Sequence, residues 1–180
     1  MLQVPPPAPG DYAPYYSRYI EPILDADLSE LFAKQPEELR SLLNNLPERY
    51  GEFKYEPGKW SIKDLLQHVI DTERIFSYRI LRIGRGETVA LPGFEHEPYV
   101  QAAGADRRSF ESLGDEFYLL RACTLTLINS LQEEDFHRTG TASDNTVAVK
   151  AMPYIIAGHF EHHIRVLKER YLPRLQEMDR

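Results

Sequence analysis

Apolar residues recur three and four positions apart along three long segments of this 180-residue chain. Such spacing places them on one face of an α-helix, so it predicts helices over residues 61–83 and 106–131 and from about residue 149 onward. The first segment begins with a capping box, in which Ser61 and Asp64 each satisfy a free backbone N–H group at the helix start. Its apolar face consists of Ile62, Leu65, Leu66, Val69, Phe76, Ile80 and Ile83.

Shorter helical pieces precede these segments. The prolines of residues 1–14 predict an extended arm that runs over the surface or is frayed. Further along, Gln35 is expected to cap a helix that starts at Pro36, because proline fits the first helical position. No region is rich in strand-forming residues, and residues 133–150 allow only a short strand or turn. The sequence therefore predicts an all-α fold: a four-helix bundle with extra short N-terminal helical segments, as one domain over residues 15–180.

Charge and composition argue against several classes of function. The net charge is −7, whereas a nucleic-acid-binding surface needs clustered Lys and Arg. No run approaches the roughly 20 apolar residues that span a bilayer, and the N-terminus lacks the layout of a signal peptide. The single cysteine, Cys123, lies in an apolar periodic segment, which predicts a buried structural thiol. We expect a cytoplasmic protein with no nucleic-acid and no membrane partner.

Three histidines stand within five residues near the C-terminus: His159, His162 and His163. His159 and His163 are one turn apart on the apolar face of their helix, so both rings can reach one metal ion. His68 is the candidate for a third ligand, and it lies at a matching depth if the two helices begin at the same end of the bundle. Polar packing inside a bundle explains the same histidines equally well, and the residues alone leave both interpretations open.

A resemblance to a known family rests on three motifs within residues 55–171: "PGKWSIKDLLQHVIDTERIFSYRILRIGRGE", "LPGFEHEPYV" and "GHFEHHIRVLKERY". In this order they resemble the DinB-like superfamily, specifically its metal-dependent hydrolase and bacillithiol-transferase branch. The resemblance implies a four-helix bundle, frequent homodimers and one divalent metal ion, zinc or nickel. The ligands that it implies are His68, His159 and His163.

The same resemblance implies an enzyme. In it the metal would activate water or a low-molecular-weight thiol for attack on a small electrophilic substrate, because three imidazoles leave a coordination position open. The sequence does not choose between hydrolysis and thiol transfer. The alternative function is a non-catalytic stress-response module that binds a metal or a ligand.

Two further residues are candidates for catalysis. Asp71 lies one turn after His68 and could orient an imidazole or a water, although a solvated carboxylate fits the position as well. His162 could replace His163 as a ligand, support the site from outside, or face solvent, and we favour the last two. Glu73 lies on the apolar side of its helix, which predicts a structural ion pair with Arg79 or Arg74.

The connection over residues 84–107 is rich in glycine and proline. Long ordered connections in compact domains are often functional, so this one, with His96 and Tyr99, is a candidate cover for the metal. Glu95 stands where the family pattern has Asp, and no role is assigned to it. Trp60 is expected to fix the start of the following helix by packing.

Overall fold

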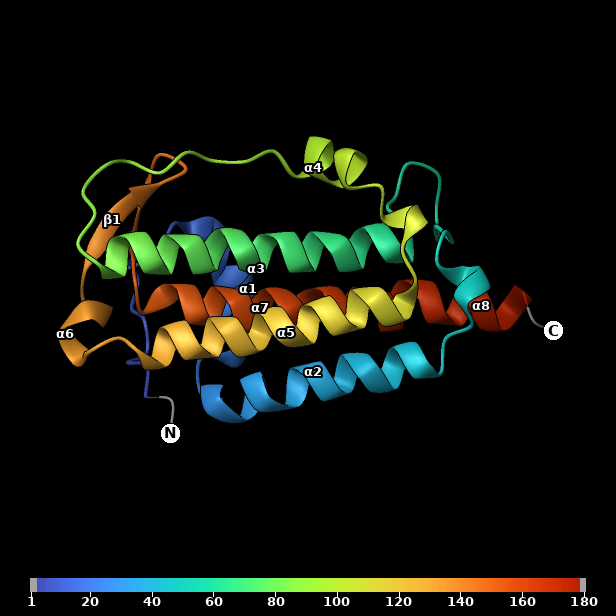
Figure 1. The fold of residues 1–180 in the computed structure, drawn as a ribbon, viewed down its shortest axis with the longest axis horizontal. Coiled ribbons are helices and arrows are strands. Elements are labelled where there is room, and N and C mark those ends of the chain that lie inside the picture. Colours follow the sequence, from blue (N-terminus) through green and yellow to red (C-terminus); the bar gives the residue numbers. More distant parts are fainter. Residues whose placement is uncertain (1–2, 179–180) are drawn as a thin grey trace.

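The computed structural model describes residues 3–178. Four long helices form a bundle: α2 (Leu28–Asn44), α3 (Ile62–Gly84), α5 (Phe110–Asn129) and α7 (Ala151–Val166). Helices α2 and α3 each pack against both α5 and α7, so the four enclose a common core (Figure 1). The predicted four-helix bundle is confirmed, and so is the capping box of Ser61 and Asp64 at the start of α3.

Helices α3 and α5 run in the same direction (Figure 1). Two parallel neighbours need a connection that returns along the bundle, and residues 85–109 provide it. Part of this connection is helical, since it contains α4 (His96–Ala103) and a 3₁₀ turn over Ala105–Arg107. The connection crosses the outer side of α3, where α4 contacts that helix.

The remaining elements are short and lie mainly at the two ends of the bundle. Strands β1 (Thr139–Ala142) and β2 (Asn145–Ala148) form an antiparallel hairpin. Its two turn residues, Ser143 and Asp144, have φ values of 52° and 60°, the left-handed conformation of tight hairpin turns. The other elements are α1 (Ser17–Ile20) between 3₁₀ turns Pro14–Tyr16 and Glu21–Ile23, a 3₁₀ turn Glu48–Tyr50, α6 (Glu133–Phe136), a π-helical turn Leu167–Tyr171 and α8 (Leu172–Met178).

The predicted start of a helix at Pro36 is wrong. Helix α2 begins eight residues earlier, where the Asp27 carboxylate accepts the backbone N–H groups of Ser29 and Glu30 at 2.8 and 3.1 Å. Pro36 is a buried interior residue of α2. Gln35 caps nothing, because its side chain donates across the bundle to the Ala157 carbonyl oxygen at 3.0 Å. Packing against α7 thus outweighs the local preference of proline for a first turn.

The expected burial of Cys123 is also wrong, since the thiol is exposed. The buried stripe of α5 passes through Arg121 and Thr124 and on to Ile128. At 3.6 residues per turn, Cys123 lies about 100° around the helix from Thr124 and therefore faces solvent. A prediction from apolar spacing alone misplaces the buried face of α5 here, because one of its buried residues is an arginine.

The proline-rich arm ends in fixed contacts with the domain. The Ala148 N–H donates to the Asp11 carbonyl oxygen at 2.8 Å, and the Asp11 carboxylate pairs with Lys150 at 2.9 Å. Tyr12 is buried in the apolar core. The end of the arm is therefore part of the packed structure at the hairpin.

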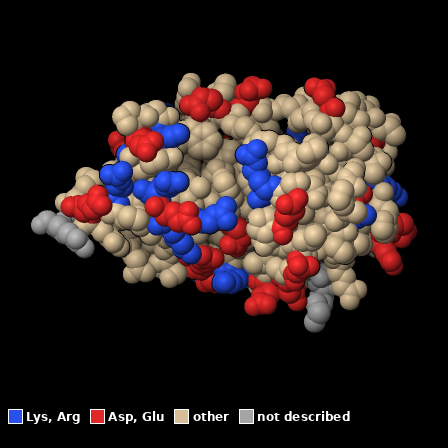
Figure 2. Space-filling model, turned by 180° about the vertical axis from the view of Figure 1, so that it is seen from behind, with Lys and Arg blue, Asp and Glu red and all other residues tan. Residues whose placement is uncertain are grey.

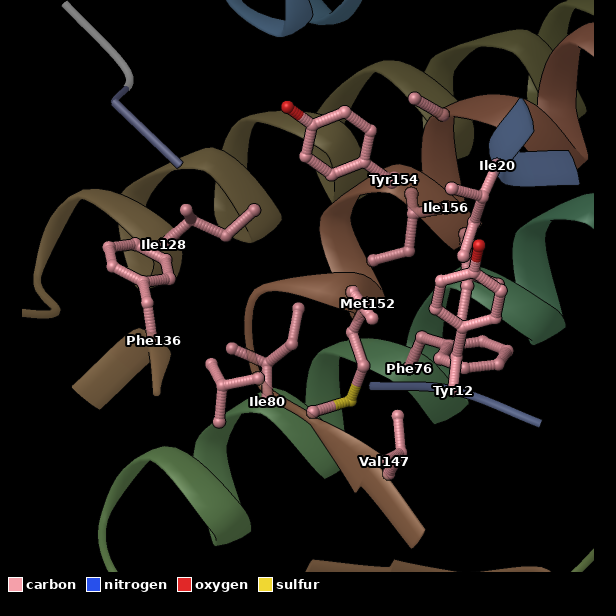
Figure 3. Close-up of a cluster of buried hydrophobic side chains, with 14 of the residues drawn as sticks. Tyr12, Ile20, Phe76, Ile80, Ile128, Phe136, Val147, Met152, Tyr154 and Ile156 are labelled. Carbon is pink, nitrogen blue, oxygen red and sulfur yellow. The ribbon is translucent and has the colours of Figure 1, made fainter. Parts of the chain in front are cut away.

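Two apolar clusters fill the bundle, one towards each end. The cluster at the hairpin end includes Phe76, Ile80 and Met152 (Figure 3), and the other includes Leu65 and Phe160. Between these clusters, each of the four long helices carries buried polar side chains: Gln35, Thr72, Glu73, Arg121, Thr124 and His159. His68, one turn before Thr72, is also buried and contacts His159. A polar layer across an apolar bundle is costly unless every group is paired, so it marks the region where function is expected.

Surface charge follows no single sign. Lys and Arg side chains gather on one half of the face in Figure 2, but acidic side chains lie among them. No helix within residues 3–178 combines the length and the apolar character needed to cross a bilayer.

Gly158 allows α1 to lie directly on α7. A Cβ atom at this position would overlap the Tyr19 carbonyl oxygen and lie 2.6 Å from the carbonyl carbon. Because these atoms belong to the backbone, α1 would have to move. We expect Gly158→Ala to lower the free energy of unfolding by about 1–3 kcal/mol, measured by urea denaturation.

Gly114→Ala is the matched control. Gly114 is also inside a helix, in the second turn of α5, but its added Cβ would meet only Leu43 Cδ1 at 3.4 Å. We expect no loss, and a gain of up to about 1 kcal/mol from better helix propensity. Equal stability of the two variants would contradict the close approach of α1 and α7.

Candidate metal centre

Three histidine side chains from α3 and α7 converge in the polar layer. The Nε2 atoms of His68 and His163 each lie 3.1 Å from Nε2 of His159. The ligand atoms of all three lie within 4.8 Å of one another. Metal–nitrogen bonds of about 2.0–2.1 Å at tetrahedral angles place two ligand nitrogens about 3.3 Å apart. The spacing of the three rings therefore fits a single divalent ion.

The two helices bring these rings together by running in opposite directions (Figure 1). The Tyr171 hydroxyl, just beyond α7, donates to the carbonyl oxygen of Trp60, just before α3, at 2.9 Å. His68 lies in the first half of α3, and the other two histidines lie in the second half of α7. The condition that both helices begin at the same end is therefore wrong, and the opposite arrangement produces the matching depth.

Burial keeps the three rings neutral. His68 and His159 are each 5% exposed. Desolvation, with a smaller effect of His96, lowers the pKa of His68 to about 3. Desolvation, with the neighbouring histidine rings, holds the pKa of His159 and of His163 well below the ordinary value. At neutral pH each ring therefore keeps the lone pair that a metal ligand needs.

Aromatic side chains surround the histidines. The Trp60 ring lies 4.6 Å from the His68 ring, centroid to centroid, and its Nε1 donates to Glu97 of α4 at 2.9 Å. Tyr19 of α1 meets His159 edge-on at 5.2 Å, and His96 of α4 meets His68 edge-on at 5.0 Å. Three elements outside the four long helices therefore fix the imidazoles and limit their contact with bulk water.

The histidines line one wall of a cavity of about 290 Å³. The remaining walls come from α1 and the turn before it, α3, the segment leading into α4 and the hairpin turn. A larger cavity of about 610 Å³ lies near α6, and none of the six histidines is among the described residues that line it. The smaller cavity is lined by all three converging histidines, so we treat it as the functional site.

The two candidate catalytic residues lie in different places. His162 lines the cavity, and its ring meets Tyr19 edge-on at 5.4 Å. Asp71 does not line it: its carboxylate accepts from Gln67 at 3.0 Å and lies 3.8 Å from Arg74. Burial raises the pKa of Asp71. Asp71 therefore belongs to a polar network on the flank of α3.

The predicted ion pair of Glu73 is confirmed, but both predicted partners are wrong. Its carboxylate binds Arg121 of α5 through two hydrogen bonds of 2.9 Å, from Nε and Nη2. Of the connection residues, His96 lines the cavity, whereas Tyr99 is exposed and packs on Phe94. The connection thus supplies two rings to the cavity, those of Phe94 and His96.

Sequence reasoning did not assign several cavity residues to the site, among them Trp60, Arg79, Thr72 and Tyr19. Trp60 was expected only to pack, and Arg79 only to pair with Glu73. Thr72 lies one turn after His68, and that spacing alone could have placed it at the site. Tyr19 carried no sequence signal, because its position depends on how α1 packs on α7.

Two comparisons place the chain among known proteins. Residues 31–167 match the DinB superfamily, and this region includes all three converging histidines. The fold is similar to that of YfiT from Bacillus subtilis, described as a probable metal-dependent hydrolase with an unusual four-helix bundle topology. The two chains are 14% identical, with a TM-score of 0.72 over 91% of this chain and 89% of YfiT. No curated protein matches the sequence. Because the match to the family covers well over half of this chain, the protein belongs to the DinB superfamily.

Proposed function

We propose that this protein is a metal-dependent enzyme that activates water or a low-molecular-weight thiol for attack on a small electrophilic substrate. One observation carries the proposal: three neutral, converging imidazoles line a cavity large enough for a small molecule. His68, His159 and His163 would hold a divalent ion. Three protein ligands leave a coordination position free, which is the pattern of catalytic rather than structural sites.

A divalent ion at such a site is a Lewis acid that lowers the pKa of a water or thiol towards neutrality. The protein would supply the other requirements. The rings of Trp60 and Tyr19 exclude water from two sides of the histidines. His162 is the candidate proton acceptor, because partial burial, with Arg165 and Arg18 nearby, lowers its pKa and leaves it neutral at pH 7.

Turnover of two substrate types, with and without chelator, tests this proposal. An activated aryl ester reports attack by water, and an aryl halide with a small thiol reports thiol transfer. We expect chelation to abolish one of the two activities and added zinc or nickel to restore it. His163→Ala should reduce that activity to background, whereas His162→Asn should keep the metal and lower kcat by about 10²-fold or more.

Turnover that survives complete removal of the metal would overturn the proposal. Bound metal without turnover of either substrate would favour the non-catalytic binding module. Imidazole ligands accept zinc and nickel alike, so both metals remain in the proposal. The homodimer and the cytoplasmic location stay predictions.

A further inference from the structure

Arg79 is a buried cation without a carboxylate partner. Its side chain is only 3% exposed, and it forms no ion pair with any residue of 3–178. Its Nη2 donates to the Pro92 carbonyl oxygen at 3.2 Å and to Ser143 Oγ at 2.8 Å. Arg121, which is equally buried, has the Glu73 carboxylate. A buried guanidinium without a counter-charge is costly, so its charge calls for an anion.

The hairpin turn holds this guanidinium in place. Ser143 has φ 52°, a left-handed conformation that a serine adopts only at some energetic cost. In this conformation its hydroxyl accepts the hydrogen bond from Arg79. The other guanidinium N–H groups have no hydrogen-bond partner within residues 3–178, which leaves them available to a ligand.

Thr72 supplies a second unsatisfied group. Its Oγ1 is the one buried side-chain nitrogen or oxygen of the described residues that has no hydrogen-bond partner. His68, Thr72 and Arg79 follow one another at positions i, i+4 and i+11 along α3, which is spacing for one side of a helix. All three line the same cavity. The α3 wall thus runs from the proposed metal to an unpaired cation, with a free hydroxyl between them.

The one other Lys, Arg, Asp or Glu among the described lining residues is also a cation. Arg18 stands at the exposed rim, and no Asp or Glu lines the cavity among the residues that the structure describes. The apolar part of the wall is aromatic, with Tyr16 and Phe76 in edge contact at 5.7 Å and Phe94 from the connection. The space favours a small molecule with a flat apolar body and a negative group.

We propose that this cavity is a binding site for a small organic oxyanion, a carboxylate or a phosphate monoester, held by Arg79 and Thr72. A bidentate contact from the guanidinium fork suits either group, and the Thr72 hydroxyl can donate to the same oxygens. As the recognition element of a substrate, this site rests on the proposed function: it would hold the negative end while the other end faces His68. The anion contact itself does not require the metal.

The test is calorimetric titration of chelator-treated full-length protein with phenylacetate, phenyl phosphate and neutral phenylacetamide. We expect at least one anion to bind, and to bind about 10-fold or more tightly than the amide. Arg79→Gln should weaken anion binding by about 10- to 100-fold and Thr72→Val by about 3- to 10-fold, with no effect on the amide. Arg82→Gln is the matched control, since Arg82 follows on the same helix, pairs with Glu87 and does not line the cavity.

The two ligands and the two variants decide the outcome. Preference for phenyl phosphate or for phenylacetate identifies the oxyanion. If Arg79→Gln fails to fold, two other variants carry the test: Thr72→Val keeps the size of the side chain, and Arg79→Lys keeps the charge but removes the bidentate fork. Equal binding of the amide and both anions, or full anion affinity in Thr72→Val and the Arg79 variants, would overturn the site. Metal content, measured on the same variants before chelator treatment, reports separately on the proposed function.

Discussion

Replacing His159 with alanine is expected to leave the purified protein with almost no bound metal. His159 is the central member of the histidine cluster and would be the central ligand, because its Nε2 lies 3.1 Å from Nε2 of both His68 and His163. Its removal leaves two imidazoles and a gap in the middle of the site. We expect the metal content, measured by mass spectrometry, to fall from about one ion per chain to almost none. Loss of a residue that only supports a ligand lowers metal affinity by up to about 100-fold, and loss of a ligand should lower it further.

Stability gives an independent measure of the same loss. An ion at 1,000 times its dissociation constant stabilises the folded state by about 4.1 kcal/mol. Zinc or nickel should therefore raise the thermal midpoint of the wild-type protein and leave that of the His159→Ala variant unchanged. His137→Ala is the control, because His137 is exposed and outside the cavity. If His159→Ala keeps one metal per chain, these histidines are polar packing residues and the enzyme proposal fails.

Replacing Glu73 with glutamine is expected to lower the free energy of unfolding by about 3–5 kcal/mol. The side chains of Glu73 and Arg121 are 2% and 1% exposed. Arg121 Nη1 donates to the amide oxygen of Gln35, a neutral group that cannot replace the carboxylate charge. Without the carboxylate, a full positive charge stays in the middle of the bundle with no counter-charge. Urea denaturation at constant m-value measures the loss.

Two further variants separate this effect from a general loss of contacts. Glu38→Gln breaks the pair with Lys168, whose side chain is 49% exposed, and it should cost less than about 1 kcal/mol. The double variant Glu73→Leu with Arg121→Met removes both charges and should recover much of the stability. A decrease of less than about 1 kcal/mol in the free energy of unfolding of Glu73→Gln would contradict the argument that the Glu73 carboxylate compensates the buried charge of Arg121.

Local sequence signals predicted the parts of the fold that local physics determines. The capping box located the start of α3, and apolar spacing located the long helices. The error at Pro36 arose because a contact between Gln35 and α7, across 122 positions, outweighs the preference of proline for a helix start. Cys123 was misplaced because Arg121, a charged residue, occupies a core position of α5.

The candidate site also has a part that the sequence predicts and a part that it does not. His68, His159 and His163 could be predicted, because their residue type and motifs are visible in the chain and their resemblance to a family is specific. Their surroundings could not. The meeting of Tyr19 with His159, and of Arg79 with Ser143, depends on helix directions and on a hairpin turn that periodicity does not determine.

The cavity wall at Tyr15, Tyr16, Arg18 and Tyr19 comes from a part of the chain that precedes the family match at residue 31. The three converging histidines all lie inside that match. One wall of the cavity and the converging histidines are therefore encoded in separable stretches of sequence, joined where Tyr19 rests on Gly158. A protein organised in this way can change the shape of one cavity wall by exchanging its first twenty-five or so residues, while the three histidines stay with the bundle.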